Sequence, residues 1–132
     1  MNKSFSRDIQ TLTYIRRNQQ KIRDAVSRFG CDLSTAGPKS ILRDEQAFDL
    51  CAMYMAQIGE NVKLLTDASK EDLNEIINIK TLTYFRNMID HSYEKVNKSV
   101  LLPYIKMAQS DKALQQVEEL IKECFRKKNS SN

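Results

Sequence analysis

Apolar residues recur at helical spacing along most of the chain. From Ser4 to Phe29 they fall on one face of a helix, and Gln19 is the single polar interruption of that face. Gly30 is a natural terminator, because the residue just past a helix often needs a positive φ. Turn-forming residues then gather in 30–40. The pattern therefore predicts a long amphipathic helix followed by a loop.

A second stripe predicts a long helix over about 42–65, with Ser40 or Asp44 as its cap. The apolar positions alternate between spacings of three and four, which favours packing against antiparallel neighbours. They are Phe48, Cys51, Met55, Ile58, Val62 and Leu65. Gly59 interrupts this helix at a cost of roughly 1 kcal/mol relative to alanine. We therefore expect another helix to approach its backbone closely, and Glu60 beside it is a candidate buried acid.

The rest of the chain predicts four further helical segments. A short one spans about 71–78 behind a weak capping box that begins at Ser69. The next spans about 79–91 and buries Leu82, Phe85 and Ile89, with Tyr84 and Met88 at the flanks. The last two span about 100–108 and from a cap at 110–111 towards a frayed end at 129–132. No linker or repeat interrupts this plan, so residues 1–132 are expected to form one all-α, up-and-down bundle of four or five helices.

Composition narrows the possible compartments. A mean hydropathy of −0.54 and the lack of a long apolar run argue against a transmembrane helix. The first residues contain no apolar segment typical of a secretory signal. Cys31, Cys51 and Cys124 are far apart and lack CxxC spacing, which is typical of reduced thiols. Together these features predict a cytoplasmic protein without membrane contact.

Charge is distributed unevenly along the chain. Residues 1–43 carry a net charge of +6, residues 44–75 carry −6, and residues 76–132 carry +4. The basic first helix and the basic tail are able to attract an RNA backbone. Solvated helix faces would give the same pattern. Charge therefore permits RNA binding without demonstrating it.

The candidate chemistry centres on His91, the only histidine in the chain, within the segment Arg86-Asn87-Met88-Ile89-Asp90-His91-Ser92-Tyr93. On an ideal helix Arg86, Asp90 and Tyr93 lie within roughly 40° of one another, whereas His91 lies about 140° from Arg86. Arg86 and His91 therefore converge on one ligand only if the helix loosens near His91 or if two chains face each other.

An arginine and a histidine together suffice for cleavage of RNA without a metal. The guanidinium forms a bidentate fork for phosphate, and an imidazole of pKa about 6.5 exchanges protons at neutral pH. The ribose 2′-OH would attack its own phosphodiester and leave a 2′,3′-cyclic phosphate. Because each chain supplies one histidine, a homodimer would be the natural arrangement. Alternatively, Arg86 merely pairs with Asp90 at i,i+4, and His91 has a structural role.

The segment from Arg86 to Tyr93 resembles the Arg-Asn-x-x-x-His-x-Tyr signature of the HepT-like branch of the HEPN domains. The segment 47–65 is also similar to that family's second helix, with Ile58-Gly59-Glu60 in place of its Ile-Gly-Glu. The tract 93–105 resembles the stretch that follows the motif. The resemblance implies an all-α homodimer with the motif residues gathered in a cleft at the dimer interface.

The resemblance also implies a function. HepT-like proteins are ribonuclease toxins of two-gene toxin–antitoxin systems that need no metal or other cofactor. Carried over, Arg86 would bind phosphate, His91 would be the general acid and base, and Asn87 would hold the local geometry. Asp90 and Glu60 are weaker candidates for supporting residues.

The resemblance further implies regulation at Tyr93, to which a partner minimal nucleotidyltransferase antitoxin would add AMP. The added bulk and negative charge would block RNA from a phosphate-binding cleft. Tyr84 and Tyr104 lie nearby in sequence and remain alternative positions. Two other functions stay open: a non-catalytic module that binds nucleotide or RNA, or docks a nucleotidyltransferase, and a purely structural helical dimer.

Overall fold

The computed structural model describes residues 2–90 and 97–130, which form six α-helices and one short 3₁₀ helix, η1. In chain order these elements are α1 (Asn2–Arg28), η1 (Ile41–Arg43), α2 (Glu45–Val62), α3 (Asp67–Asn74), α4 (Ile79–Asp90), α5 (Lys98–Ala108) and α6 (Asp111–Ser130). The predicted all-α bundle is therefore confirmed for this part of the chain. None of these helices is long and apolar enough to cross a membrane.

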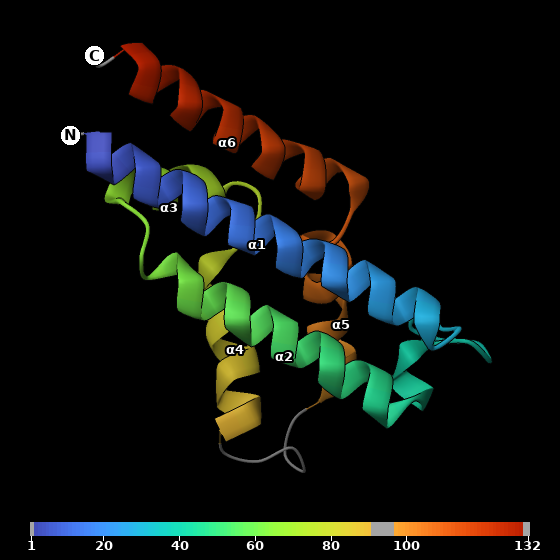
Figure 1. Ribbon diagram of the computed structural model, residues 1–132. Helices are drawn as coiled ribbons and strands as arrows, with labels where there is room; N and C mark the ends of the chain where they lie inside the picture. Colours follow the sequence, from blue (N-terminus) through green and yellow to red (C-terminus); the bar gives the residue numbers. More distant parts are fainter. Residues whose placement is uncertain (1, 91–96, 131–132) are drawn as a thin grey trace.

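Helix α1 lies at the centre of the arrangement (Figure 1). Helices α2 and α6 pack along it on two sides, and both run in the opposite direction. Helix α4 packs on α2, while α4 and α5 run across the long helices behind them. The sequence predicted four or five up-and-down helices. The short helix predicted near 71–78 is present as α3, and the described helices depart from the up-and-down plan because α4 and α5 are not aligned with α1.

The core confirms the stripe predicted for α2. All six of its predicted apolar positions are buried, and together with Leu12, Ile15 and Ile22 of α1 they form the centre of the molecule. In α4 two positions differ from expectation, since Met88 is buried and Ile89 only partly so. Periodicity locates a helical face to within about one residue, and the neighbouring helices decide which flank is covered.

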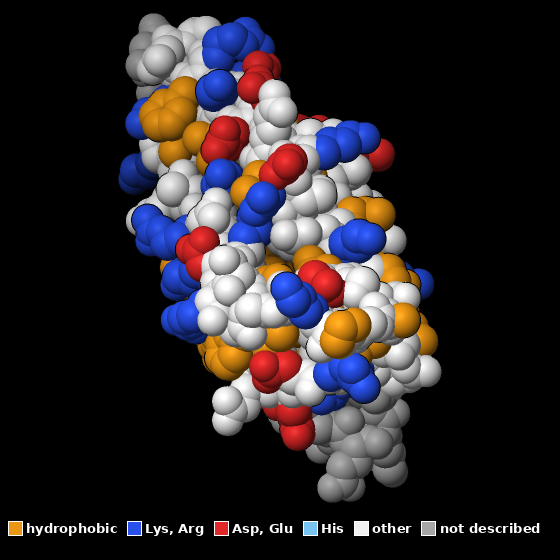
Figure 2. Space-filling model, turned by 90° about the vertical axis from the view of Figure 1, so that its right-hand side faces the viewer, with side chains coloured by type: hydrophobic (Ala, Val, Ile, Leu, Met, Phe, Trp, Pro, Cys, Tyr) orange, Lys and Arg blue, Asp and Glu red, His pale blue; other side chains and the backbone are white. Residues whose placement is uncertain are grey.

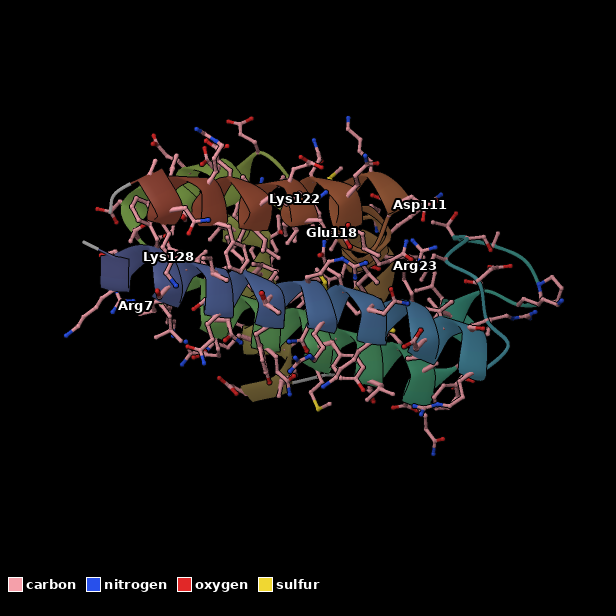
Figure 3. The ribbon with its side chains drawn as sticks, turned by 45° about the horizontal axis from the view of Figure 1, so that its top comes forward. Arg7, Arg23, Asp111, Glu118, Lys122 and Lys128 are labelled. Atoms are coloured by element: carbon pink, nitrogen blue, oxygen red, sulfur yellow. The ribbon has the colours of Figure 1, made fainter. Side chains whose placement is uncertain are left out.

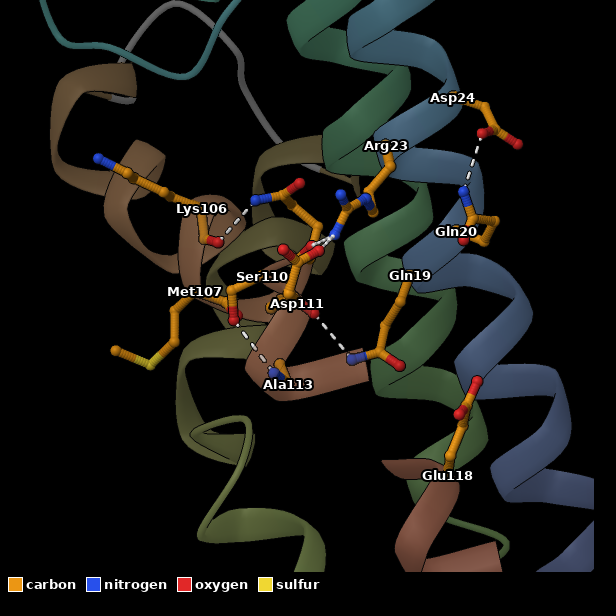
Figure 4. A network of polar contacts seen from close by, with 12 residues as sticks. Gln19, Gln20, Arg23, Asp24, Lys106, Met107, Ser110, Asp111, Ala113 and Glu118 are labelled. Carbon is orange, nitrogen blue, oxygen red and sulfur yellow. Dashed lines mark hydrogen bonds and ion pairs between the residues drawn. The ribbon is translucent and has the colours of Figure 1, made fainter. Parts of the chain in front are cut away.

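Helix α1 buries polar side chains as well as apolar ones, because it is contacted on two sides. Asp8, Thr11, Asn18 and Gln19 are all buried. The Gln19 amide nitrogen donates a 2.8 Å hydrogen bond to the carbonyl of Ala108 at the end of α5 (Figure 4). The last carbonyls of a helix lack partners within it, so this bond satisfies one of them. Gln19, the polar residue on the apolar face of α1, therefore joins that helix to the end of α5.

Caps set the observed helix boundaries. Asp44 caps α2 and Ser40 caps η1, so each candidate caps a different helix. Helix α3 begins at Asp67, not near 71, and its cap is Thr66 rather than Ser69. Ser69 lies inside α3, and its hydroxyl donates a 2.6 Å hydrogen bond to the buried carboxylate of Asp8.

Two other boundaries also differ from the sequence prediction. Helix α5 begins at Lys98, with Asn97 as its cap, and continues through Pro103. Helix α6 extends to Ser130 and so includes two of the residues expected to fray.

The close approach expected at Gly59 is present. A Cβ built on Gly59 would lie 3.2 Å from the Cβ of Leu82 on α4, and Leu82 is 1% exposed. This spacing leaves little room for a larger residue, because the facing atom belongs to a packed side chain. Gly59 therefore fixes how close α4, and with it Arg86, comes to α2.

Replacing Gly59 with valine is expected to destabilise the protein by about 2–3 kcal/mol, because two further carbons would overlap the packed Leu82 side chain. Gly59→Ala is the matched control. Its gain in helix propensity, about 1 kcal/mol, offsets a mild contact, so its free energy of unfolding should stay within about 1 kcal/mol of the wild type. Urea denaturation measures both variants. Equal stability of the two would contradict the close approach.

Candidate functional site

Arg86 projects from the last full turn of α4 and is bound by carboxylates from two helices. Its Nη1 atom lies 2.8 Å from Oε1 of Glu60 on α2, and its Nε atom lies 3.5 Å from Oδ2 of Asp90. The i,i+4 pair with Asp90 is therefore present. The Arg86 side chain is 48% exposed, so part of its guanidinium remains open to solvent. The two carboxylates hold that group at the surface between α2 and α4.

Glu60 is not the buried acid that its position beside Gly59 suggested. Its side chain is 50% exposed and pairs with both Arg86 and Lys63, whose Nζ atom lies 3.3 Å from each carboxylate oxygen. Gly59 faces α4, and successive residues of a helix differ in direction by about 100°. Glu60 is consequently turned out of the helix–helix contact.

The four side chains Lys63, Glu60, Arg86 and Asp90 alternate in charge across the α2–α4 surface. All of them are roughly half exposed, and exposed pairs of this kind contribute at most about 1 kcal/mol each. The main effect of this cluster is therefore to orient the guanidinium rather than to stabilise the fold.

Two hollows adjoin the cluster, and both are lined by Glu60 and Arg86. One, of about 280 Å³, lies between α2 and the start of α4 and also includes Lys63 and Lys70. The other, of about 320 Å³, lies beside Met53, Gln57, Ile89 and Asp90. These volumes are near the lower end of the range for small-ligand sites. Each hollow is large enough for a phosphate or part of a nucleotide next to Arg86.

His91 and Tyr93 lie outside the described residues, as do all of positions 91–96. Asn87 is exposed, and no hydrogen bond joins its side chain to another described residue. The structure therefore brings Arg86, Glu60 and Asp90 together, whereas the predicted roles of Asn87, His91 and Tyr93 remain predictions. Tyr84 is 45% exposed and lies near the ring of Tyr104, with 6.4 Å between the centroids.

The cysteines do not offer a nucleophile. Burial raises the pKa of the Cys51 thiol to about 12. Burial also raises the pKa of Cys124, and desolvation together with the nearby Asp44 carboxylate raises that of Cys31. All three thiols are therefore protonated at neutral pH, and the thiolate is the reactive form.

Sequence reasoning missed two members of the site, Lys63 and Lys70. Lys63 follows Glu60 by three positions, a spacing that places two helical side chains side by side and was open to detection. Lys70 belongs to α3, and only the tertiary fold brings it to the hollow. Within the described ranges 2–90 and 97–130, no group of three histidine, cysteine or acidic side chains has the arrangement of a metal site.

Comparisons with protein-family models, with curated proteins and with solved structures gave no match to this chain.

Proposed function

We propose that this protein is a metal-independent endoribonuclease, the toxin of a HEPN/nucleotidyltransferase toxin–antitoxin pair. It acts as a HEPN-like homodimer in the cytoplasm. Arg86 binds the phosphate of the RNA, and His91 is the general acid and base. Tyr93 is the residue to which the nucleotidyltransferase antitoxin adds AMP.

The observation that carries the proposal is the position of Arg86. Its guanidinium is half exposed, borders two hollows and is held by Glu60 at 2.8 Å. A fork held in this way has lost much of its rotational freedom before a phosphate arrives, so less entropy is lost on binding. His91 is the next residue after α4 ends at Asp90. The helical bundle is also the fold class that the sequence resemblance implies.

The proposed reaction is an internal transfer of the phosphodiester. His91 of one subunit accepts the proton of the ribose 2′-OH, whose oxygen attacks the adjacent phosphorus. The bond from phosphorus to the 5′-oxygen breaks, and the second subunit's histidine donates a proton to that leaving oxygen. The products are a 2′,3′-cyclic phosphate and a 5′-hydroxyl. Arg86 stabilises the negative charge that grows on the phosphate oxygens.

In this proposal Glu60 and Asp90 are positioning residues. Both carry negative charge and contact the guanidinium, so they orient it and also reduce the net positive charge of the site. RNA displaces at least one of these contacts when its phosphate binds Arg86. AMP on Tyr93 would add a further negative charge to the same cleft and prevent that exchange.

The neutralised Arg86 also favours a second candidate function, a non-catalytic module. Two carboxylates already satisfy much of the guanidinium, and an exposed pair of this kind is able to dock a nucleotide or a nucleotidyltransferase without chemistry. Such a module would bind RNA or nucleotide equally well with or without His91. The same experiment separates the two functions.

The test is cleavage of RNA by purified protein in EDTA, with wild type beside His91→Ala and with Tyr93 confirmed by mass to be unmodified. Wild type is expected to yield cyclic-phosphate ends, and His91→Ala should lose at least about 100-fold in rate, the lower range for general acid–base catalysis. Intact RNA in both samples would favour the binding module. Cleavage that requires added metal would refute the proposed mechanism.

A further inference from the structure

A third hollow, of about 600 Å³, lies between α1 and the end of α2, on a side of α2 next to the one that faces Arg86. Its α1 wall carries Arg7, Tyr14 and Arg17, and its other wall carries Asn61 at the end of α2 and Leu64 just past that helix. These five residues define the α1–α2 groove. Gln10, Thr11 and Thr13 complete its polar lining.

The groove adjoins the Arg86 site along α2. Glu60 and Lys63 line the Arg86 hollow, and the residues that follow them directly, Asn61 and Leu64, line the groove. Successive helical residues point about 100° apart. The two sites therefore open on neighbouring sides of the end of α2 and of the turn that follows it, and an extended chain is able to cross from one to the other.

The two arginines of the groove, Arg7 and Arg17, differ from Arg16 and Arg23 on the same helix in having no acidic partner among the residues that the structure describes. Arg16 pairs with Glu118 at 3.0 Å, and Arg23 pairs with Asp111, so both are neutralised by α6 (Figure 3). Arg7 and Arg17 are exposed and form no ion pair with any residue in the described part of the chain. Arg7 lies on the side of α1 away from α6 (Figure 3). The groove is thus lined by two cations that lack acidic partners there.

The charge of the groove differs from that of the face shown in Figure 2, where acidic and basic side chains are interspersed. In the groove the lining carries two positive charges, no acidic residue, and an aromatic ring that is 37% exposed. Unpaired cations with an accessible aromatic ring are typical of sites for single-stranded nucleic acid, where the cations follow the phosphates and a base stacks on the ring.

We propose that the α1–α2 groove binds the single-stranded RNA that flanks the bond cleaved at Arg86, with Arg7 and Arg17 on its phosphates and Tyr14 stacked against a base. The inference rests on the proposed function for its substrate. Arg7 and Arg17 are ten residues apart, a rise of about 15 Å along α1. That distance exceeds one nucleotide, so the groove contributes to binding of an oligonucleotide and not of a dinucleotide.

The test is equilibrium binding of 2′-O-methyl RNA, which lacks the attacking hydroxyl and is therefore not cleaved. A labelled oligonucleotide of about 12 nucleotides, within the range bound by single-strand sites, is compared with a dinucleotide. Arg7→Ala/Arg17→Ala should weaken binding of the oligonucleotide at least about tenfold. It should also reduce the slope of log affinity against log salt by about 1.4, since each phosphate contact on a single strand contributes about 0.7.

The matched control is Lys106→Ala/Lys112→Ala, which removes the same charge from exposed positions on α5 and α6 outside the groove. It should change the affinity by less than about threefold. Tyr14→Ala should weaken binding about tenfold through lost stacking, whereas Tyr14→Phe keeps the ring and should bind like the wild type. The dinucleotide should bind the wild type and the groove variants equally.

Three binding results would overturn the inference. The groove variants would bind the oligonucleotide as tightly as the wild type does, the lysine control would lose as much affinity as the groove variants, or the wild type would not bind RNA. Size-exclusion chromatography provides a further test. Groove variants that change the oligomeric state and keep their affinity for RNA would assign the groove to a contact between two copies of the chain. Loss of binding in the groove variants of a protein that does not cleave RNA would support the groove and refute the nuclease. Groove variants that cleave RNA and bind it normally would support the nuclease and refute the role of the groove.

Discussion

Replacing Arg86 with alanine is expected to reduce RNA cleavage by about 10²–10³-fold, the typical loss when one group that stabilises transition-state charge is removed. The free energy of unfolding should change by less than about 1 kcal/mol, because the Arg86 pairs with Glu60 and Asp90 are half exposed. Arg86→Lys should recover only part of the rate, because an ammonium keeps the charge and loses the bidentate geometry. Initial cleavage rates and urea denaturation measure the two effects.

Arg126→Ala is the matched control for this prediction. Arg126 is also exposed, also lies near the end of a helix and also pairs with a glutamate, Glu123, yet it belongs to α6 and lies outside the α2–α4 surface. Its replacement should leave the cleavage rate within about twofold of the wild type. An Arg86→Ala protein that folds normally and cleaves at the wild-type rate would remove Arg86 from the mechanism.

Replacing Asp8 with alanine is expected to destabilise the protein by about 3–5 kcal/mol. The Asp8 side chain is buried and accepts three hydrogen bonds, one at 3.0 Å from the Thr66 amide and two at 2.6 Å from the hydroxyls of Thr66 and Ser69. Alanine leaves these donors without their acceptor, and hydrogen bonds to a charged group are the stronger class. The change also frees the α2–α3 turn from α1.

The urea midpoint of Asp8→Ala should therefore fall well below that of Asp24→Ala, its control on the same helix. Asp24 accepts an exposed hydrogen bond from Gln20, and its loss should cost less than about 1 kcal/mol. Asp8→Asn keeps one acceptor oxygen and should fall between the two. If Asp8→Ala and Asp24→Ala unfold at the same urea concentration, the buried hydrogen bonds of Asp8 contribute nothing to stability.

The sequence determined the helices and the buried face of α2, because helical periodicity is a local property of neighbouring residues. The same reasoning placed the close approach at Gly59 and the Arg86–Asp90 pair, both of which follow from positions on a single helix. It also predicted Ser40 or Asp44 as the cap of α2, of which Asp44 is the one observed, since a cap acts within a few residues of its helix.

The tertiary structure alone decided which distant residues meet. Asp8 bonds to Thr66, which lies 58 positions away and is the cap of α3. Glu60 was expected to be buried, yet its side chain is half exposed and pairs with Arg86 of the neighbouring helix α4. Similarly, the sequence does not distinguish Arg7 from Arg16. The packing of α6 against α1 brings Glu118 to Arg16, whereas Arg7 lies in the groove. Such contacts depend on how helices pack, and no local pattern specifies that.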